Sequence, residues 1–114
     1  MFVGTVNPDG TPQVTPTWVD TDGKLVLVNT AVGRVKYRNV KRNPNVSLAI
    51  YEQTNPYNLA MIKGKVIDFV TGRPAEEHID KMAKKYMGRD KYPNRKPGEQ
   101  RVILKIQPVK VTGM

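Results

Sequence analysis

The sequence contains no cysteine and a single histidine, His78. Without cysteine, the chain forms no disulfide, carries no thiolate nucleophile and offers no sulfur ligand to zinc or to an iron–sulfur cluster. One imidazole also excludes a metal site built on two histidines of the same chain. The longest uncharged apolar stretch is far shorter than the ~20 residues that span a bilayer, and no signal-peptide pattern opens the chain. We therefore expect one cytoplasmic domain over residues 1–114, with no membrane partner.

Acidic residues are scarce, because ten Asp and Glu stand against nineteen Lys and Arg, which gives a net charge of +9. The surplus lies in two clusters, at residues 34–42 and 81–101. A basic surplus of this size favours polyanionic partners such as nucleic acid, anionic lipid or a phosphorylated ligand. The second cluster is equally compatible with an ordinary solvated surface, whereas the first lies next to residues that are able to bind phosphate.

Alternating apolar residues and frequent turn signals predict a mainly β domain with six strands and two short helices. The expected strands are residues 2–5, 12–20, 24–29, 46–52, 57–70 and 101–111, and the expected helices are residues 34–42 and 74–87. The first three strands should form an antiparallel meander, and Pro16 places the second either at a sheet edge or at a local bulge. Gly64 is the expected bulge of the fifth strand. Six strands joined by tight turns favour a small barrel over a sandwich.

No glycine-rich nucleotide loop, nucleophile elbow or paired-histidine zinc motif occurs in the sequence. His78 precedes Ile79 on the charged flank of the second predicted helix, so a solvent-exposed side chain is expected there. Asp20 and Asp22 are interpreted as turn residues and not as a catalytic carboxylate pair. We therefore predict no catalytic side chain and no metal site, and any reaction would depend on a bound cofactor.

The segment between the third strand and the first helix is the best candidate for a binding site. Asn29 and Thr30 end an apolar strand, Gly33 follows, and Arg34 and Lys36 enter the first turn of the helix. Free N–H groups at a helix start, together with the positive end of the helix dipole, bind phosphate. Cations in that turn oppose the dipole unless an anion is bound, which favours a phosphate site. From the spacing alone, a plain surface helix stays open as the alternative.

Short motifs follow one another along nearly the whole chain in the order of a known family. Residues 9–19 (DGTPQVTPTWV), 29–30, 33–40 (GRVKYRNV) and 42–48 (RNPNVSL) together resemble the pyridoxamine 5′-phosphate oxidase-like split β-barrel flavoproteins. Residues 55–57, 64–66, 83–88, 92–93 and 97–102 are similar to the deazaflavin branch of that family, the F420-dependent reductases. Members of the family have a helix before the first strand, whereas this chain begins almost within that strand, so we expect that helix to be absent.

This resemblance implies a homodimer of six-stranded antiparallel split barrels, the FMN-binding split-barrel fold, with two cofactor sites at the interface. It implies that phosphate is bound by Asn29, Thr30, Arg34 and Lys36. It implies that the flavin ring lies along Gln13, Val14, Thr15, Pro16 and Thr17, and that the partner chain contributes Asn55, Pro56 and Tyr57. In this family a hydride passes between the reduced ring and a small organic molecule such as an enone or quinone, without a covalent nucleophile from the protein.

The second basic cluster favours F420 over FMN as the cofactor. F420 carries a phosphodiester and an acidic glutamyl tail, which need a longer positive track than the single phosphate of FMN. The segment 106–111 lacks the Trp and Arg with which true pyridoxamine phosphate oxidases complete their site, and the single imidazole disfavours a haem-binding relative. The alternatives are an FMN-binding oxidoreductase of the same fold, a flavin carrier without turnover, and a small barrel that binds nucleic acid. An aromatic content of 7% argues against the last, so we expect no nucleic-acid partner.

Overall fold

The computed structural model describes residues 1–52 and 54–113 of the chain. Its strands are β1 (Phe2–Val6), β2 (Pro12–Pro16), β3 (Asp20–Thr21), β4 (Val26–Ala31), β5 (Asn45–Glu52), β6 (Asn55–Thr71) and β7 (Arg101–Gly113). Its helices are α1 (Val35–Arg42) and α2 (Arg73–Met87). The predicted mainly β fold with two helices is therefore confirmed, with seven strands in place of the expected six.

The strands form one sheet in the order β2-β1-β5-β6-β7-β4-β3, in which all neighbours are antiparallel. The additional strand arises because the predicted strand 12–20 is interrupted after Pro16 and pairing resumes at Asp20. The predicted meander of the first three strands is wrong, since β2 pairs with β1 whereas β4 lies between β7 and β3. A proline has no N–H to donate to a ladder, and β2 is indeed an edge strand. Beyond Pro16 the chain leaves β1 and crosses to the opposite end of the sheet.

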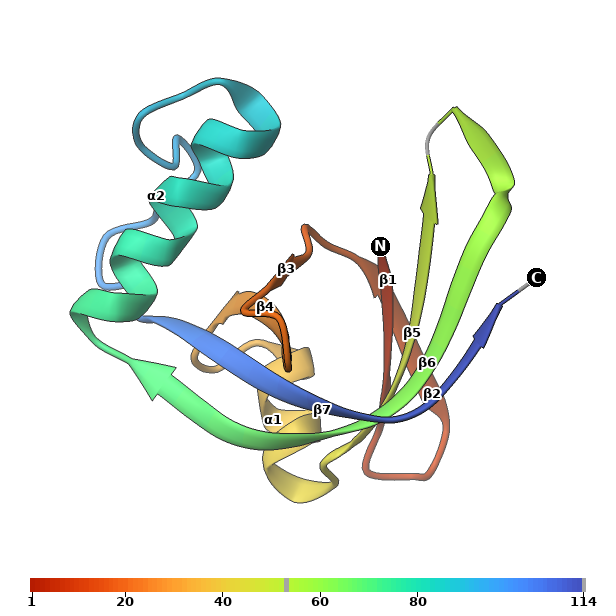
Figure 1. Ribbon diagram of the computed structural model, residues 1–114. Coiled ribbons are helices and arrows are strands. Elements are labelled where there is room, and N and C mark those ends of the chain that lie inside the picture. The colour runs from red at the N-terminus through yellow and green to blue at the C-terminus, as the bar shows by residue number, and fades with distance from the viewer. Residues whose placement is uncertain (53, 114) are drawn as a thin grey trace.

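The long strands β6 and β7 curve through the molecule and curl the sheet into a split barrel (Figure 1). Their register shifts between Lys63 and Gly64, which confirms the predicted bulge. A Cβ atom at Gly64 would lie 2.8 Å from the carbonyl oxygen of Gln107. Glycine is therefore required where the two backbones approach each other at the bend.

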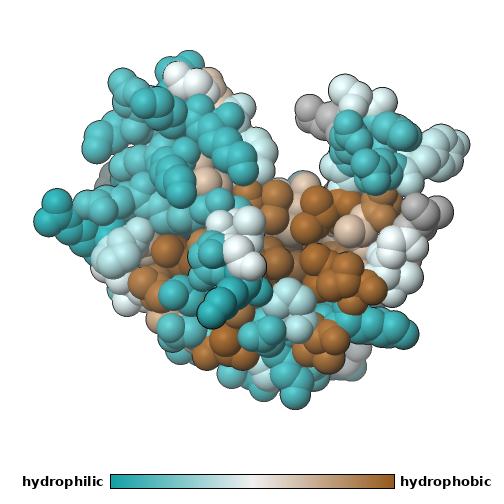
Figure 2. All heavy atoms as spheres, in the orientation of Figure 1, coloured by the Kyte–Doolittle hydropathy of each residue, from teal (hydrophilic) through white to brown (hydrophobic). Residues whose placement is uncertain are grey.

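The curled sheet leaves two projections on one side of the molecule, namely α2 and the tip of the β5–β6 hairpin (Figure 1). Figure 2 shows apolar side chains along the floor of the hollow between them, whereas both projections are mostly polar. The floor of the hollow is thus an apolar patch on this face of the molecule.

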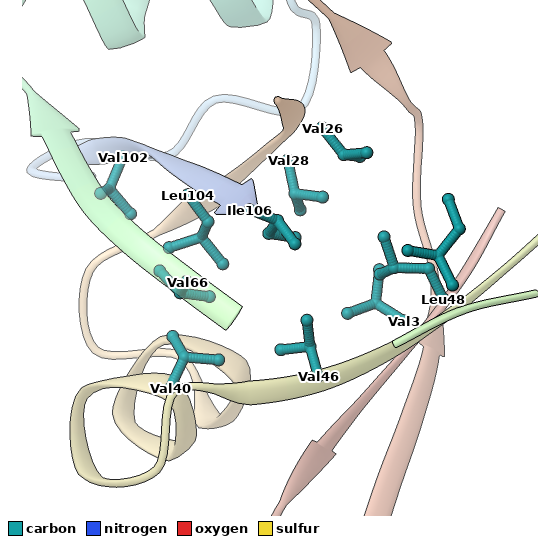
Figure 3. Packing of buried hydrophobic residues seen from close by; sticks show 11 residues of the cluster. Val3, Val26, Val28, Val40, Val46, Leu48, Val66, Val102, Leu104 and Ile106 are labelled. Atoms are coloured by element: carbon teal, nitrogen blue, oxygen red, sulfur yellow. The ribbon is translucent and has the colours of Figure 1, made fainter. Parts of the chain in front are cut away.

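The hydrophobic core lies inside the curled sheet, where side chains from the strands and from α1 converge (Figure 3). Its buried members are Val3, Val26, Val28, Val40, Val46, Leu48, Ile62, Val66, Val102, Leu104 and Ile106. Burying a side chain of this size contributes about 1.5–3 kcal/mol to folding. Val40 is the member that comes from α1, so the core itself holds this helix against the barrel.

The second helix, α2, packs its apolar face on the sheet through Ile79, Met82 and Ala83. Pro74 lies in its first turn, and Gly88 ends it in the left-handed conformation with φ of 71°. Both signals were readable in the sequence, and the predicted bounds agree with the observed ones to within a residue. No helix in the described part of the chain is long and apolar enough to cross a membrane.

Candidate functional site

A cleft of about 420 Å³ opens where β4, α1, α2 and the segment after β2 meet. It is lined by Pro16, Thr17, Trp18, Asn29, Thr30, Arg34, Lys36, Ile79, Met82, Tyr92, Asn94 and Arg101. The cations gather at the end next to α1, and aromatic and apolar side chains come from the segment after β2, from α2 and from the loop that follows α2. The cleft therefore offers one end to an anion and one wall to an apolar or planar group.

Lys36 is the buried cation of the cleft. It shares a face of α1 with Asn39 and Val40, and only 9% of its surface is exposed. None of the ion pairs and hydrogen bonds found among residues 1–52 and 54–113 involves its ammonium group. Burial, followed by the positive charges of Arg34 and Arg101, lowers the pKa of Lys36 from 10.5 to about 8. A buried cation without a counter-ion is unfavourable unless an anion is bound, so the position is suited to one.

Arg101 adds a second buried cation to the same end, which the sequence reasoning did not assign to the site. Its side chain is 3% exposed, its Nη1 donates to Glu99 Oε1, and Glu99 also pairs with Arg34 at 3.3 Å. Burial opposes ionisation of Glu99, but hydrogen bonds from the Lys96 N–H and from Arg101 hold the pKa of Glu99 below its usual value. This carboxylate thus serves two guanidinium groups and leaves the ammonium of Lys36 uncompensated.

The start of α1 supports anion binding through its backbone as well. Arg34 is the N-cap residue in extended geometry, its side chain makes no capping hydrogen bond, and the first turn contains no acidic residue. The N–H groups of that turn have no partner within the helix. They add to the positive potential that Lys36 and Arg34 create.

Asn29 lines the cleft, but its amide group is already engaged. Its Nδ2 donates to the carbonyl oxygen of Ala75 and lies 3.0 Å from His78 Nδ1, and its Oδ1 accepts from Arg101 Nε at 2.8 Å. Asn29 therefore holds Arg101 in place. Thr30, Arg34 and Lys36 also line the cleft, and no hydrogen-bond network among the described residues ties these three together. That all four residues bind phosphate, as the resemblance implies, stays a prediction.

The expectation that His78 is exposed is wrong, since its side chain is 8% exposed. Its ring lies between Asn29 and Asp20, with Nε2 at 3.1 Å from Asp20 Oδ2. The helix pattern placed His78 on the charged flank of α2, but β3 and β4 cover that flank. Asp20 is likewise more than a turn residue, whereas Asp22 does close the turn by accepting hydrogen bonds from the N–H groups of Lys24 and Leu25.

An aromatic wall forms the second side of the cleft. Trp18 stacks on Tyr86 with ring centroids 5.4 Å apart, and it meets Tyr92 edge-on at 6.1 Å. The hydroxyl of Tyr86 donates to the carbonyl oxygen of Val19 at 2.9 Å, which fixes the stack. Trp18 and Tyr92 were present in the motifs quoted above, but their spacing of 74 positions hid their proximity.

Only part of the predicted ring-binding segment lines the cleft. Pro16 and Thr17 line the cleft, whereas Gln13 accepts a hydrogen bond from Thr5 and does not line it. The Thr15 hydroxyl is buried without a partner among the described residues. Val14 lines a separate, largely apolar groove of about 370 Å³.

The residues expected from a partner chain lie far from the cleft of their own chain. Asn55 and Tyr57 are exposed at the start of β6, beside the tip of the β5–β6 hairpin and on the side of the molecule opposite α2 (Figure 1). Tyr57 is 81% exposed, and the Asn55 side chain accepts from its backbone N–H. Pro56 lies in β6, and its side chain is outside the described part of the structure.

Comparisons with known proteins agree with this fold. A structure of an F420 reductase is 33% identical, covers 97% of this chain and 86% of its own, and superposes with a TM-score of 0.83. A conserved hypothetical protein of Mycobacterium tuberculosis, 20% identical over 96% of this chain and 72% of its own, gives a TM-score of 0.68. HupZ of group A Streptococcus, 18% identical over 96% and 80%, gives 0.64. The two latter likenesses show the fold alone.

A comparison with curated proteins gives no match. The family model described as pyridoxamine 5′-phosphate oxidase matches residues 1–114, the whole of the chain. The chain therefore belongs to the pyridoxamine 5′-phosphate oxidase family.

Proposed function

We propose that the protein is an F420-dependent oxidoreductase whose cleft binds the deazaflavin cofactor. The observation that carries the proposal is the ammonium group of Lys36, which is buried, faces Arg34 and Arg101, and has no anionic partner among residues 1–52 and 54–113. The similarity to an F420 reductase supports the same cofactor. The family also supports the broader assignment as a flavin or deazaflavin oxidoreductase.

The side chains at the cationic end fit a phosphate group. Lys36, Arg34 and Arg101 would neutralise its charge, and Thr30 and the N–H groups that begin α1 would donate hydrogen bonds. The bound cofactor supplies hydride transfer to or from a small enone-like or quinone-like molecule. The chain's own contribution is to bind and orient the cofactor and to keep water from the apolar wall of the cleft.

The basic residues after Gly88 support F420 over FMN. Arg95 pairs with Asp80 and Glu76, and Lys91 pairs with Asp80, so these two hold the loop 89–99 against α2. Lys84, Lys85, Arg89 and Lys96 extend the positive surface beyond the cleft and would meet the acidic tail of F420. Such exposed charges act only over about 8–10 Å at physiological salt.

We also propose that the protein works as a homodimer with two cofactor sites at the interface. The groove on the outer face of the sheet is mostly apolar and includes exposed Phe2, Val14 and Met61. Exposed apolar surface of this kind is typical of protein interfaces. A second copy seated there would bring Asn55, Pro56 and Tyr57 of one chain towards the cofactor of the other.

The test is a titration of the purified protein with F420 and with FMN, followed by ring fluorescence. We expect F420 to bind with micromolar affinity and FMN much more weakly; the reverse order would make the protein an FMN enzyme. The variant Lys36→Ala should weaken F420 binding by about 1–3 kcal/mol, and Lys24→Ala, at an exposed turn, should leave it unchanged. If Lys36→Ala binds F420 as tightly as the natural protein does, the phosphate binds elsewhere. Reduction of enone and quinone acceptors by the loaded protein separates an enzyme from a carrier.

A further inference from the structure

A chain of buried polar groups runs behind the cationic end of the cleft. Asp20 Oδ2 lies 3.1 Å from His78 Nε2, His78 Nδ1 lies 3.0 Å from Asn29 Nδ2, and Asn29 Oδ1 accepts from Arg101 Nε at 2.8 Å. These four residues come from β3, α2, β4 and β7. His78 does not line the cleft, so any effect on a ligand must pass through Asn29 and Arg101.

The orientation of the Asn29 amide follows from its two other partners. The carbonyl oxygen of Ala75 accepts only, so it requires the NH2 group, and Arg101 Nε donates only, so it requires the amide oxygen. His78 Nδ1 faces that NH2 group and must accept. In the neutral ring the proton is then on Nε2, which donates to Asp20 Oδ2.

We propose that His78 is a positioning residue which, through Asn29, holds the guanidinium group of Arg101 at the anion end of the cleft and releases it when the imidazole is protonated. This rests on the proposed function, because a bound phosphate is what Arg101 would contact. A protonated ring carries a donor on both nitrogens, so Nδ1–H would face the NH2 group of Asn29. Rotation of the amide relieves that conflict, but it turns the NH2 group onto the Arg101 Nε–H and the amide oxygen onto the Ala75 carbonyl oxygen, so both of those hydrogen bonds are lost.

The charges around His78 keep this release to acidic pH. Asp20 favours the imidazolium, while Lys81, which is 3.7 Å from the same carboxylate oxygen, opposes it. Arg101, on β7, follows Asn29 in this chain of hydrogen bonds and adds a positive charge. Glu99 compensates part of that charge. Burial outweighs the attraction of Asp20, so the pKa of His78 is below its usual 6.5. At neutral pH the ring is therefore uncharged and the chain of hydrogen bonds is complete.

The variant His78→Asn tests the positioning role of residue 78 separately from the protonation of its side chain. An asparagine places a carboxamide oxygen near the site of Nδ1, so it accepts from Asn29 but does not change its charge with pH. The variant His78→Leu keeps the volume without any acceptor. Both substitutions are first checked for folding by circular dichroism and thermal melting.

The first measurement needs no ligand. NMR of 15N-labelled protein should find the Nε2–H tautomer of His78 at pH 7.5. The Arg101 Nε–H should be protected from exchange at pH 7.5 and lose that protection at pH 5.0 in the natural protein but not in His78→Asn. An Nδ1–H tautomer at pH 7.5, or equal Arg101 protection in both proteins at pH 5.0, would overturn the proposal.

The second measurement is F420 affinity at the same two pH values. We expect the natural protein to lose about fivefold more affinity than His78→Asn on going to pH 5.0, and His78→Leu to bind about fivefold more weakly at both. Because the glutamyl tail titrates equally in all three proteins, the comparison cancels its effect. Parallel losses in the natural protein and His78→Asn would contradict the positioning role while leaving the proposed function intact. Absence of F420 and FMN binding at either pH would refute the proposed function, and the NMR result would still decide the role of His78.

Discussion

Arg101 and Asn29 lie 72 positions apart in the chain, yet Arg101 Nε donates to Asn29 Oδ1 at 2.8 Å inside the protein. Their strands, β7 and β4, are neighbours in the sheet, with Asn29 paired to Ile103 and Ala31 to Arg101. The ladder therefore delivers a guanidinium group to the end of β4 at which α1 begins.

The buried charge of Lys36 should cost stability in the free protein. Replacing it by methionine, of similar length, removes a desolvated ammonium, and the lowered pKa indicates a gain of about 1–3 kcal/mol in the free energy of unfolding at pH 7. Urea unfolding of Lys36→Met and of Lys24→Met, at an exposed site, measures this. If Lys36→Met is less stable than the natural protein, the ammonium has a partner in the free protein.

The titration of Lys36 gives stability and ligand binding opposite pH dependences. Its pKa is about 8 when folded and 10.5 when unfolded, so between these values the unfolded chain binds more protons. Stability should therefore rise as pH increases from about 8 to 10.5. Affinity for an anionic cofactor should fall over the same range, because the ammonium is lost. Urea midpoints and F420 titrations across this range test both signs, and a flat binding curve would contradict the phosphate contact.

The close approach at Gly64 should not tolerate a side chain. An alanine Cβ would lie 2.8 Å from the Gln107 carbonyl oxygen and 2.9 Å from Ile106 Cγ2. Gly64→Ala should lower the free energy of unfolding by about 1–3 kcal/mol, as overpacking does. Gly4→Ala is the matched control, because its nearest atom, the Ser47 carbonyl oxygen, is 3.5 Å away. Equal melting temperatures for the two variants would show that β7 yields at the bulge.

The apolar groove should bury Val14 in the dimer. Val14 is 62% exposed in the single chain, so Val14→Lys should leave the fold intact and shift the protein towards monomer. Light scattering coupled to size-exclusion chromatography gives the mass. Met87→Lys introduces the same charge at the end of α2, at a side chain that is 43% exposed, and should remain dimeric. A Val14→Lys protein of unchanged dimer mass would move the interface away from this groove.

Trp18 should report on ligand binding, because it is the sole tryptophan and lines the cleft. A cofactor bound beside the indole absorbs its emission, so saturation with F420 should quench tryptophan fluorescence in step with cofactor binding. Tyr86→Phe keeps the stacked ring but loses the hydrogen bond to the Val19 carbonyl oxygen. It should preserve the quenching and weaken affinity by about threefold. Unchanged emission at saturation would place the cofactor outside the cleft.

The elements were predictable where their signals are local. Pro74 and Gly88 set the ends of α2, and Pro16 predicted an edge strand, because each acts through its own backbone geometry. Gly64 predicted the bulge in the same way. The prediction of a meander was wrong because each strand can pair with any of several apolar strands. The periodicity of a strand does not specify which of them becomes its neighbour.

The candidate site was half predictable for the same reason. Thr30, Arg34 and Lys36 lie within seven positions of one another, so a strand that leads into a helix brings them together. Arg101, Trp18 and Tyr92 reach the same cleft from distant segments, and no local pattern links them. His78 was misjudged because a helix pattern shows which side chains share a face and not which elements cover that face.

The amino-acid sequence by itself determined the β-rich elements, the surplus of positive charge and the corner between β4 and α1, because these depend on residues close together in the chain. Only the tertiary structure decided that Lys36 is buried with no counter-ion among the described residues and that Asn29 is held between His78 and Arg101. Desolvation and hydrogen-bond partnership are properties of packed segments, and here those segments are separated by tens of residues.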